Sequence, residues 1–189
     1  MSKTTHSAPD KVHCTPLDEP SPWVVRFADL VRRGAEVLDL ACGSGRHCRV
    51  FLDLGHPVTA LDRDLSRLAP ARDTPGLTAI EADLEDGSPW PLAGRLFGAV
   101  VVTNYLYRPL FPKILAALEP GGVLIYETFA LGNERFGKPR NPDHLLAAGE
   151  LLEAVRGSLK VIAYEDLERP PPKRARMQRI CAACPDPSP

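Results

Sequence analysis

An acid followed by a run of small residues is the clearest sign of chemistry in this sequence. Asp39 lies in the apolar segment 37–41, and Ala41, Gly43 and Gly45 follow it at alternating positions. Glycine readily adopts the positive φ of a tight turn, and small side chains let a ligand approach the backbone. A helix that starts at such a turn points its amide groups at the ligand, which favours an anionic group such as a carboxylate. We therefore predict a ligand-binding turn at 39–45.

Two further acids close the next two apolar segments. Asp62 follows the segment 58–61, and Asp83 follows the segment 77–81. A carboxylate at the first position can accept hydrogen bonds from both hydroxyls of a ribose, and one at the second can accept a bond from the amine of an adenine. Each acid alone has an ordinary explanation, as a helix cap or as part of a solvated acidic loop. Their joint spacing behind the glycine turn indicates a nucleoside site.

Alternating strands and helices are needed to bring these residues together. A helix opened by Ser21-Pro22 comes first and ends at Gly34. Strands are expected at 37–41, 58–61, 77–81, 97–102 and 123–126, and helices at 46–54, 65–72, 111–118 and 145–155. The last strand candidates, 161–164 and 178–182, are joined by a loop, which predicts an antiparallel pair. Such alternation gives a parallel sheet covered by helices on both faces, with ligands beyond the carboxyl ends of the strands.

These residues resemble the class I S-adenosylmethionine-dependent methyltransferases. That family's loop reads acid-x-Gly-x-Gly-x-Gly, and here Ala41 takes the place of the first glycine between Asp39 and Gly43. The turn 118–122, Leu-Glu-Pro-Gly-Gly, matches the one before the family's fifth strand. The similarity covers roughly residues 20–183 and is greatest to small, single-domain bacterial members related to the tellurite-resistance type. It implies a Rossmann-like doubly wound α/β sheet of about seven strands, mostly parallel with an antiparallel C-terminal strand and helices on both faces.

The resemblance implies S-adenosyl-L-methionine as the cofactor and S-adenosyl-L-homocysteine as its product. It assigns Asp62 to the ribose and Asp83 to the adenine, with Arg63 and Leu84 beside them. The expected cofactor-binding set is completed by Asp39, Ala41, Gly43, Gly45 and Asn104. Methyl transfer from a sulfonium is an in-line displacement from an activated donor, so the protein mainly supplies alignment. No metal is expected.

Acceptor-side residues are expected on the loops that follow the fourth and fifth strands. We predict Tyr107, Glu127 and Arg135 as candidates, the last within the polar segment 133–140, which is typical of a substrate lid or of a solvated loop. Tyr105 and Tyr107 either pack in the core or line the pocket, and Glu127 either anchors structure or acts as a base. His47 is expected to be a partly exposed helix residue, and the other histidines lack partner spacing.

Other functions stay open on the sequence alone. A nicotinamide dinucleotide domain needs Gly-x-Gly-x-x-Gly, and counting from Gly43 puts the third place on Cys48. A non-catalytic protein that binds the cofactor or a partner would keep the same motif. Nucleic-acid and protein methyltransferases are further alternatives, although residues 104–107 lack the Asn-Pro-Pro-aromatic motif that resembles amino-group methyltransferases. We expect a small-molecule acceptor, because the chain carries little besides the cofactor fold.

Composition sets the remaining limits. Lys plus Arg total 23 and Asp plus Glu total 24, and this net charge of −1 disfavours nucleic acid as the main partner. No apolar run approaches the roughly 20 residues of a membrane helix. We expect no signal peptide at the start of the chain. The cysteines number 5, and without an export signal we expect them to be reduced thiols in the cytoplasm. Cys181 and Cys184 form only half of a zinc-site pattern. We expect a flexible arm at 1–19, one domain at 20–184 and a flexible tail at 185–189.

Overall fold

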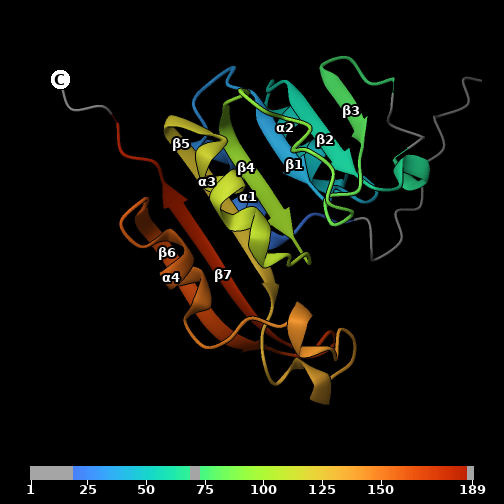
Figure 1. Cartoon of the computed structure of the whole chain (residues 1–189), viewed down its shortest axis with the longest axis vertical. Coiled ribbons are helices and arrows are strands. Elements are labelled where there is room, and N and C mark those ends of the chain that lie inside the picture. The colour runs from blue at the N-terminus through green and yellow to red at the C-terminus, as the bar shows by residue number, and fades with distance from the viewer. Residues whose placement is uncertain (1–18, 69–72, 187–189) are drawn as a thin grey trace, which may run out of the picture.

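A seven-stranded sheet forms the centre of the computed structural model, which describes residues 19–68 and 73–186 (Figure 1). The strands are β1 (Val37–Leu40), β2 (Val58–Asp62), β3 (Leu77–Glu81), β4 (Phe97–Thr103), β5 (Leu118–Phe129), β6 (Lys160–Arg169) and β7 (Ala175–Ala183). Their order across the sheet is β3-β2-β1-β4-β5-β7-β6. Strands β1 to β5 run parallel, and β7 pairs antiparallel with both β5 and β6. The expected Rossmann-like sheet is confirmed, and its order reverses between β1 and β4, the place where such sheets bind ligands.

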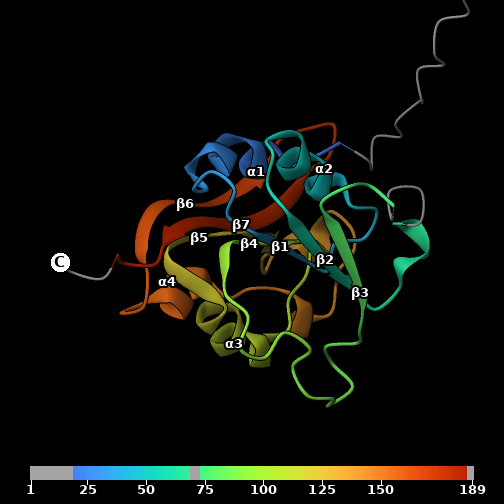
Figure 2. The same ribbon diagram turned by 90° about the horizontal axis from the view of Figure 1, so that it is seen from above.

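Helices cover both faces of this sheet (Figure 2). They are α1 (Pro22–Phe27), α2 (Arg46–Asp53), α3 (Phe111–Ala116) and α4 (Glu150–Val155). The first two lie on one face and the last two on the other, as Figure 2 shows. Each pair closes a separate apolar core, with Trp23 and Phe51 in the first and Ile114 and Leu151 in the second. Within the described ranges, no helix combines the length and the apolar character that crossing a bilayer requires.

The central strands are buried along their whole length. Every residue of β1 and β4 is buried, as expected for parallel strands covered on both faces. Successive side chains of a strand point to opposite faces. Leu38 and Leu40 pack in the core under α3 and α4, whereas Val37 packs in the core under α1 and α2. Asp39 shares the face of Val37, so the fold directs this acid at α2.

The expected helix at 145–155 begins later than the apolar pattern predicts. It is helical only from Glu150, after Gly149 turns the chain at φ 71°. Leu145 and Leu146 are buried instead in extended chain, where Leu146 forms an isolated parallel bridge with Ala130 at the end of β5. These two apolar side chains pack against the end of the sheet. Periodicity alone does not distinguish such residues from the apolar face of a helix.

Other boundaries shift without changing the topology. Strand β5 begins at Leu118 and so includes the expected turn 118–122, and the register of its pairing with β4 shifts there. Strands β6 and β7 are longer than the segments 161–164 and 178–182. The expected helix at 65–72 contains a 3₁₀ turn at Leu65–Arg67, and its end falls in 69–72, outside the described residues. Most of the expected arm (1–18) and the last residues of the tail (187–189) also lie outside them.

Candidate active site

The turn after β1 has the backbone that the glycine motif predicts. Ala41, Gly43 and Gly45 adopt positive φ values of 56°, 56° and 71°. Gly45 has no space for a side chain, because a Cβ there would lie 2.4 Å from Cδ1 of the buried Leu68. A non-glycine residue in this conformation costs about 1–2 kcal/mol, so Ala41 stores strain at the mouth of the turn.

The two strand-end acids are oriented by backbone amides. Asp62 Oδ2 accepts a hydrogen bond from the Gly43 N–H at 2.8 Å, and its Oδ1 accepts one from the Asp64 N–H at 3.1 Å. Asp83 Oδ1 accepts a bond from the Glu85 N–H at 2.9 Å. A carboxylate accepts up to about four hydrogen bonds, so both acids keep lone pairs free for a ligand.

Asp39 lies beneath the turn and is only 1% exposed. Its Oδ2 accepts a hydrogen bond from the Cys48 thiol at 3.1 Å, while Oδ1 has no hydrogen-bond partner. Burial raises the pKa of Asp39 to about 6, against the opposing attraction of Cys48 and Arg46. Hydrogen bonding with Cys42 and burial raise the pKa of the Cys48 thiol, so it stays a donor. At neutral pH a buried negative charge therefore sits directly under the glycine turn.

Two adjoining hollows open beyond the carboxyl ends of the strands. The larger hollow has a volume of about 490 Å³, which is in the range of ligand pockets, and the smaller one has a volume of about 240 Å³. Ala41, Asn104 and Tyr105 line both hollows. Of the predicted cofactor residues, those that line the larger hollow are Ala41, Asp62, Arg63, Asp83, Leu84 and Asn104. The smaller hollow is lined by Gly43, with Ser44, Arg46, Arg67 and Thr103 around it. The remaining two predicted cofactor residues, Gly45 and Asp39, line neither hollow. Among the described residues no group of His, Cys, Asp or Glu side chains is arranged to hold a metal ion.

A second wall of the larger hollow comes from later in the chain. It consists of Tyr105, Leu106, Thr128, Phe129, Pro139 and His144. Burial and the neighbouring carboxylate of Glu85 raise the pKa of the Tyr105 phenol, so this group is a hydrogen-bond donor at neutral pH. The sequence predicts Tyr105 in either the core or the pocket, and Pro139 lies in the expected polar segment 133–140. Leu106, Thr128 and Phe129 lie where the fourth and fifth strands end, the region expected on the acceptor side, but they are not the residues singled out there. No spacing in the sequence marks His144.

The three predicted acceptor-side residues do not line either hollow. Tyr107 is half-buried and packs against the core under α3. Glu127 is buried, and its charge is the strongest attraction opposing the fall in pKa that burial imposes on Arg46. Arg135 is exposed, 4.0 Å from Glu168, with its guanidinium over the ring of Phe136. Their part in acceptor binding stays a prediction, and Glu127 is linked to the site through Arg46.

His47 differs from its expected place on the surface. It is 1% exposed, and its Nε2 accepts a hydrogen bond from the Ser21 N–H at 3.1 Å. The ring proton therefore lies on Nδ1, which faces Thr103 Oγ1 at 3.4 Å. Burial lowers the pKa of His47 to about 3, so the imidazole stays neutral. The side chain ties the start of α1 to the end of β4, a contact between segments that sequence spacing does not reveal.

Comparisons with known proteins agree with this geometry. Residues 37–122 match a family described as a methyltransferase domain. The malonyl-[acyl-carrier protein] O-methyltransferase of Salmonella typhimurium is 36% identical over 107 residues, which span 54% of this chain and 42% of that protein. The chain thus spans less than half the length of this curated relative.

Solved structures share the fold over most of this chain at low identity. TehB from Haemophilus influenzae superposes with a TM-score of 0.69 at 18% identity, covering 85% of this chain and 61% of that one. The 1,6-didemethyltoxoflavin-N1-methyltransferase of Burkholderia thailandensis, solved with bound 1,6-didemethyltoxoflavin and S-adenosylhomocysteine, gives a TM-score of 0.64 at 19% identity, covering 87% of this chain and 77% of that one. At these identities the likeness establishes the fold.

Proposed function

We infer that this chain, a class I S-adenosylmethionine-dependent methyltransferase, transfers the methyl group of S-adenosyl-L-methionine to a small acceptor and releases S-adenosyl-L-homocysteine. The observation that carries this inference is the meeting of the turn after β1 with Asp62 and Asp83 around one hollow. The matched residues 37–122 include all of these groups.

The donor groups around the two hollows fit the parts of this cofactor. Asp62 and Asp83 offer carboxylate oxygens to the ribose hydroxyls and the adenine amine. Ser44 and Arg67, in the smaller hollow, offer donors to a carboxylate. The buried charge of Asp39 beneath the turn favours the cationic ammonium and sulfonium groups. The other predicted contacts, Arg63, Leu84 and Asn104, border the same space.

The residues of the chain hold and orient the reactants. Bound S-adenosylmethionine supplies a methyl group on a positively charged sulfur, which is already activated for displacement. We assign Asn104 to the side of the methyl group, because it lies where the two hollows meet. Its N–H donates to the Glu127 carbonyl at 3.0 Å, which fixes the chain where it leaves β4. Orienting the reactants in this way is the main contribution that a protein makes to such a methyl transfer.

The acceptor is proposed to enter along the second wall of the larger hollow. The name of the Salmonella relative specifies an acyl-carrier-linked acceptor, and a small free or carrier-linked acceptor suits the size of this hollow. Glu127 would act through Arg46, while Tyr107 and Arg135 would act from outside the hollow. The free thiols of Cys42, Cys48, Cys181 and Cys184 support a reducing compartment such as the cytoplasm.

Titration calorimetry with S-adenosylmethionine and S-adenosylhomocysteine tests the proposal. Asp62→Ala removes the ribose acceptor, and we expect a loss of about 2–4 kcal/mol, on the order of 30- to 1000-fold in affinity. Asp64→Ala is the matched control, because Asp64 is exposed, caps the 3₁₀ turn through the Ser66 N–H at 2.8 Å and lines neither hollow. Absence of binding by the wild type, or equal affinity in Asp62→Ala, contradicts the assignment.

Turnover is tested by following S-adenosylhomocysteine release with small thiols, amines, carboxylates and oxyanions as acceptors. We expect release with at least one of these classes. Tight cofactor binding without release for any of them would favour the alternative of a non-catalytic binding protein.

A further inference from the structure

One histidine stands on the second wall of the larger hollow. His144 ends the 3₁₀ turn Pro142–His144 and lines the larger hollow together with Tyr105, Phe129 and Pro139. It and Tyr105 are the titratable side chains that this wall contributes. The strand-end side carries Asp62, Arg63, Asp83 and Glu85. An imidazole accepts a hydrogen bond when neutral and donates two when protonated, so it can meet a hydroxyl, an amine or an oxyanion.

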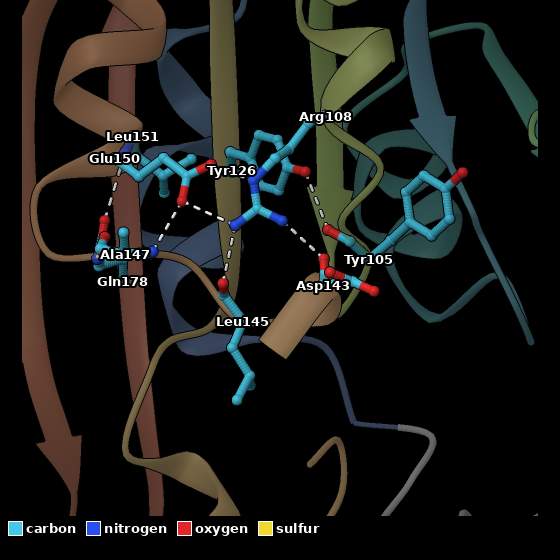
Figure 3. A network of polar contacts seen from close by, with 9 residues as sticks. All are labelled: Tyr105, Arg108, Tyr126, Asp143, Leu145, Ala147, Glu150, Leu151 and Gln178. Atoms are coloured by element: carbon cyan, nitrogen blue, oxygen red, sulfur yellow. Dashed lines mark hydrogen bonds and ion pairs between the residues drawn. The ribbon is translucent and has the colours of Figure 1, made fainter. Parts of the chain in front are cut away.

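A single arginine holds the backbone on both sides of His144 (Figure 3). Arg108 Nη1 donates to the Asp143 carbonyl at 2.7 Å, and Nη2 donates to the Leu145 carbonyl at 2.9 Å. The guanidinium also forms a two-point pair with Glu150, with Nε 2.6 Å from Oε1 and Nη2 2.9 Å from Oε2. Arg108 follows directly on the loop of Tyr105 and Tyr107, so it ties the two parts of the second wall together.

The segment that carries His144 is fixed from its other side as well. The Leu146 N–H donates to the Phe129 carbonyl at 3.0 Å, next to the bridge with Ala130. Gln178, fully buried on β7, donates from Nε2 to the Ala147 carbonyl at 2.5 Å and accepts from the Leu151 N–H at 3.3 Å, as Figure 3 shows. The Ala147 N–H donates to Glu150 Oε2 at 2.7 Å. An exposed histidine thus stands on a backbone held by an arginine, a glutamate and a buried amide.

We propose that His144 lies against the transferred methyl group and contacts the acceptor, and that Arg108 is the positioning residue that holds it there. The proposal rests on the proposed function, since it needs S-adenosylmethionine in the hollows. The acceptor class that fits is one whose nucleophilic oxygen or nitrogen forms a hydrogen bond with an imidazole. Such an acceptor reaches the methyl carbon in line within the larger hollow, which both His144 and Asn104 line.

The test is nuclear magnetic resonance on the full chain with S-adenosylmethionine carrying a ¹³C-labelled methyl group. We expect a nuclear Overhauser effect between that methyl group and the ring protons of His144, assigned by its disappearance in His144→Gln. His56 is an internal control, because its Nδ1 bonds the Ala35 carbonyl at 3.0 Å and it lines neither hollow. If calorimetry finds tight binding but the methyl group gives no effect to His144, the inference is wrong and the proposed function stands. If the cofactor does not bind, both are wrong.

The role of Arg108 is tested in the same experiment. In Arg108→Gln we expect the methyl–His144 effect to be lost while cofactor affinity stays within a few fold of the wild type. Arg156→Gln is the matched control, because Arg156 forms a two-point pair with Glu153 on the surface, away from both hollows. Should Arg108→Gln fail to fold, Arg108→Lys takes its place, with a weakened effect expected. An unchanged effect in a folded Arg108 variant overturns the positioning role.

Discussion

The two sides of the larger hollow are built in different ways. On the strand-end side, the Asp83 carboxylate accepts a hydrogen bond from the Glu85 N–H. The Asp62 carboxylate accepts one from the Asp64 N–H and one from the Gly43 N–H in the turn after β1. Behind the second wall, Arg108 bonds residues 143, 145 and 150, and Gln178 bonds residues 147 and 151. The bonds on the first side thus lie within a motif or join neighbouring strand ends, whereas those behind the second wall form only once more distant segments have met.

The two sides also differ in how their charges are satisfied. Asp39 is buried with one oxygen unbonded, while the Arg108–Glu150 pair is partly exposed and bonded at each end. A buried, incompletely paired charge lowers stability, and functional sites commonly carry such a cost. The turn after β1 therefore carries strain and an incompletely paired charge, whereas the Arg108–Glu150 network behind the second wall stabilises its own loops.

The largest effect is expected from Gly45→Ala. The new Cβ would meet Leu68 Cδ1 at 2.4 Å and would hold a positive φ, so we expect a loss of about 3 kcal/mol in the free energy of unfolding and weaker cofactor binding. Gly55→Ala is the matched control, with φ 83° and nothing within 4 Å, and should cost about 1 kcal/mol. Urea unfolding measures both variants. Equal losses would mean that backbone conformation alone, and not space, selects glycine at residue 45.

An effect of opposite sign, and at most as large, is expected from Asp39→Asn. Burial raises the folded-state pKa of Asp39 from 3.8 to about 6, so the ionised carboxylate destabilises the fold above that pH, and the cost fades as pH falls toward the unfolded value. The variant should be more stable than the wild type by up to about 3 kcal/mol near neutral pH, with the gap closing in acid. Thermal unfolding across pH measures this gap. A variant less stable at every pH would show that the carboxylate is paired more strongly than its contacts indicate.

The smallest effect is expected from Arg108→Gln. The variant loses its bonds to Glu150 and to the carbonyls of Asp143 and Leu145, and because Arg108 is partly exposed we expect a cost of about 1–2 kcal/mol. Arg156→Gln, which breaks only a surface pair with Glu153, should change stability by less than about 0.5 kcal/mol. Hydrogen exchange of the amides at 143–151 localises the difference. If protection is lost evenly over the chain instead, the hydrogen bonds of Arg108 do not form a network separate from the rest of the fold.

Most of the sheet could be predicted from the sequence because each strand carries its own signal. The alternation of short apolar segments with helical segments predicted that the first strands pair in parallel, and the loop between β6 and β7 predicted the antiparallel pair. The predicted start of the last helix at residue 145 was wrong, because burial at a sheet end and burial on a helix face require the same residue types, here Leu145 and Leu146.

The sequence by itself determined the turn after β1, because a positive φ and a lack of space select glycine wherever the chain must turn that way. The acids that follow the strands could also be read from the sequence, and they converge because parallel strands bring their carboxyl ends to one edge of the sheet. Only the tertiary structure decided that His47 is buried and that His144 stands in the larger hollow. Those environments depend on contacts with Ser21, Thr103 and Arg108, which lie far from them in the chain and follow no fixed spacing.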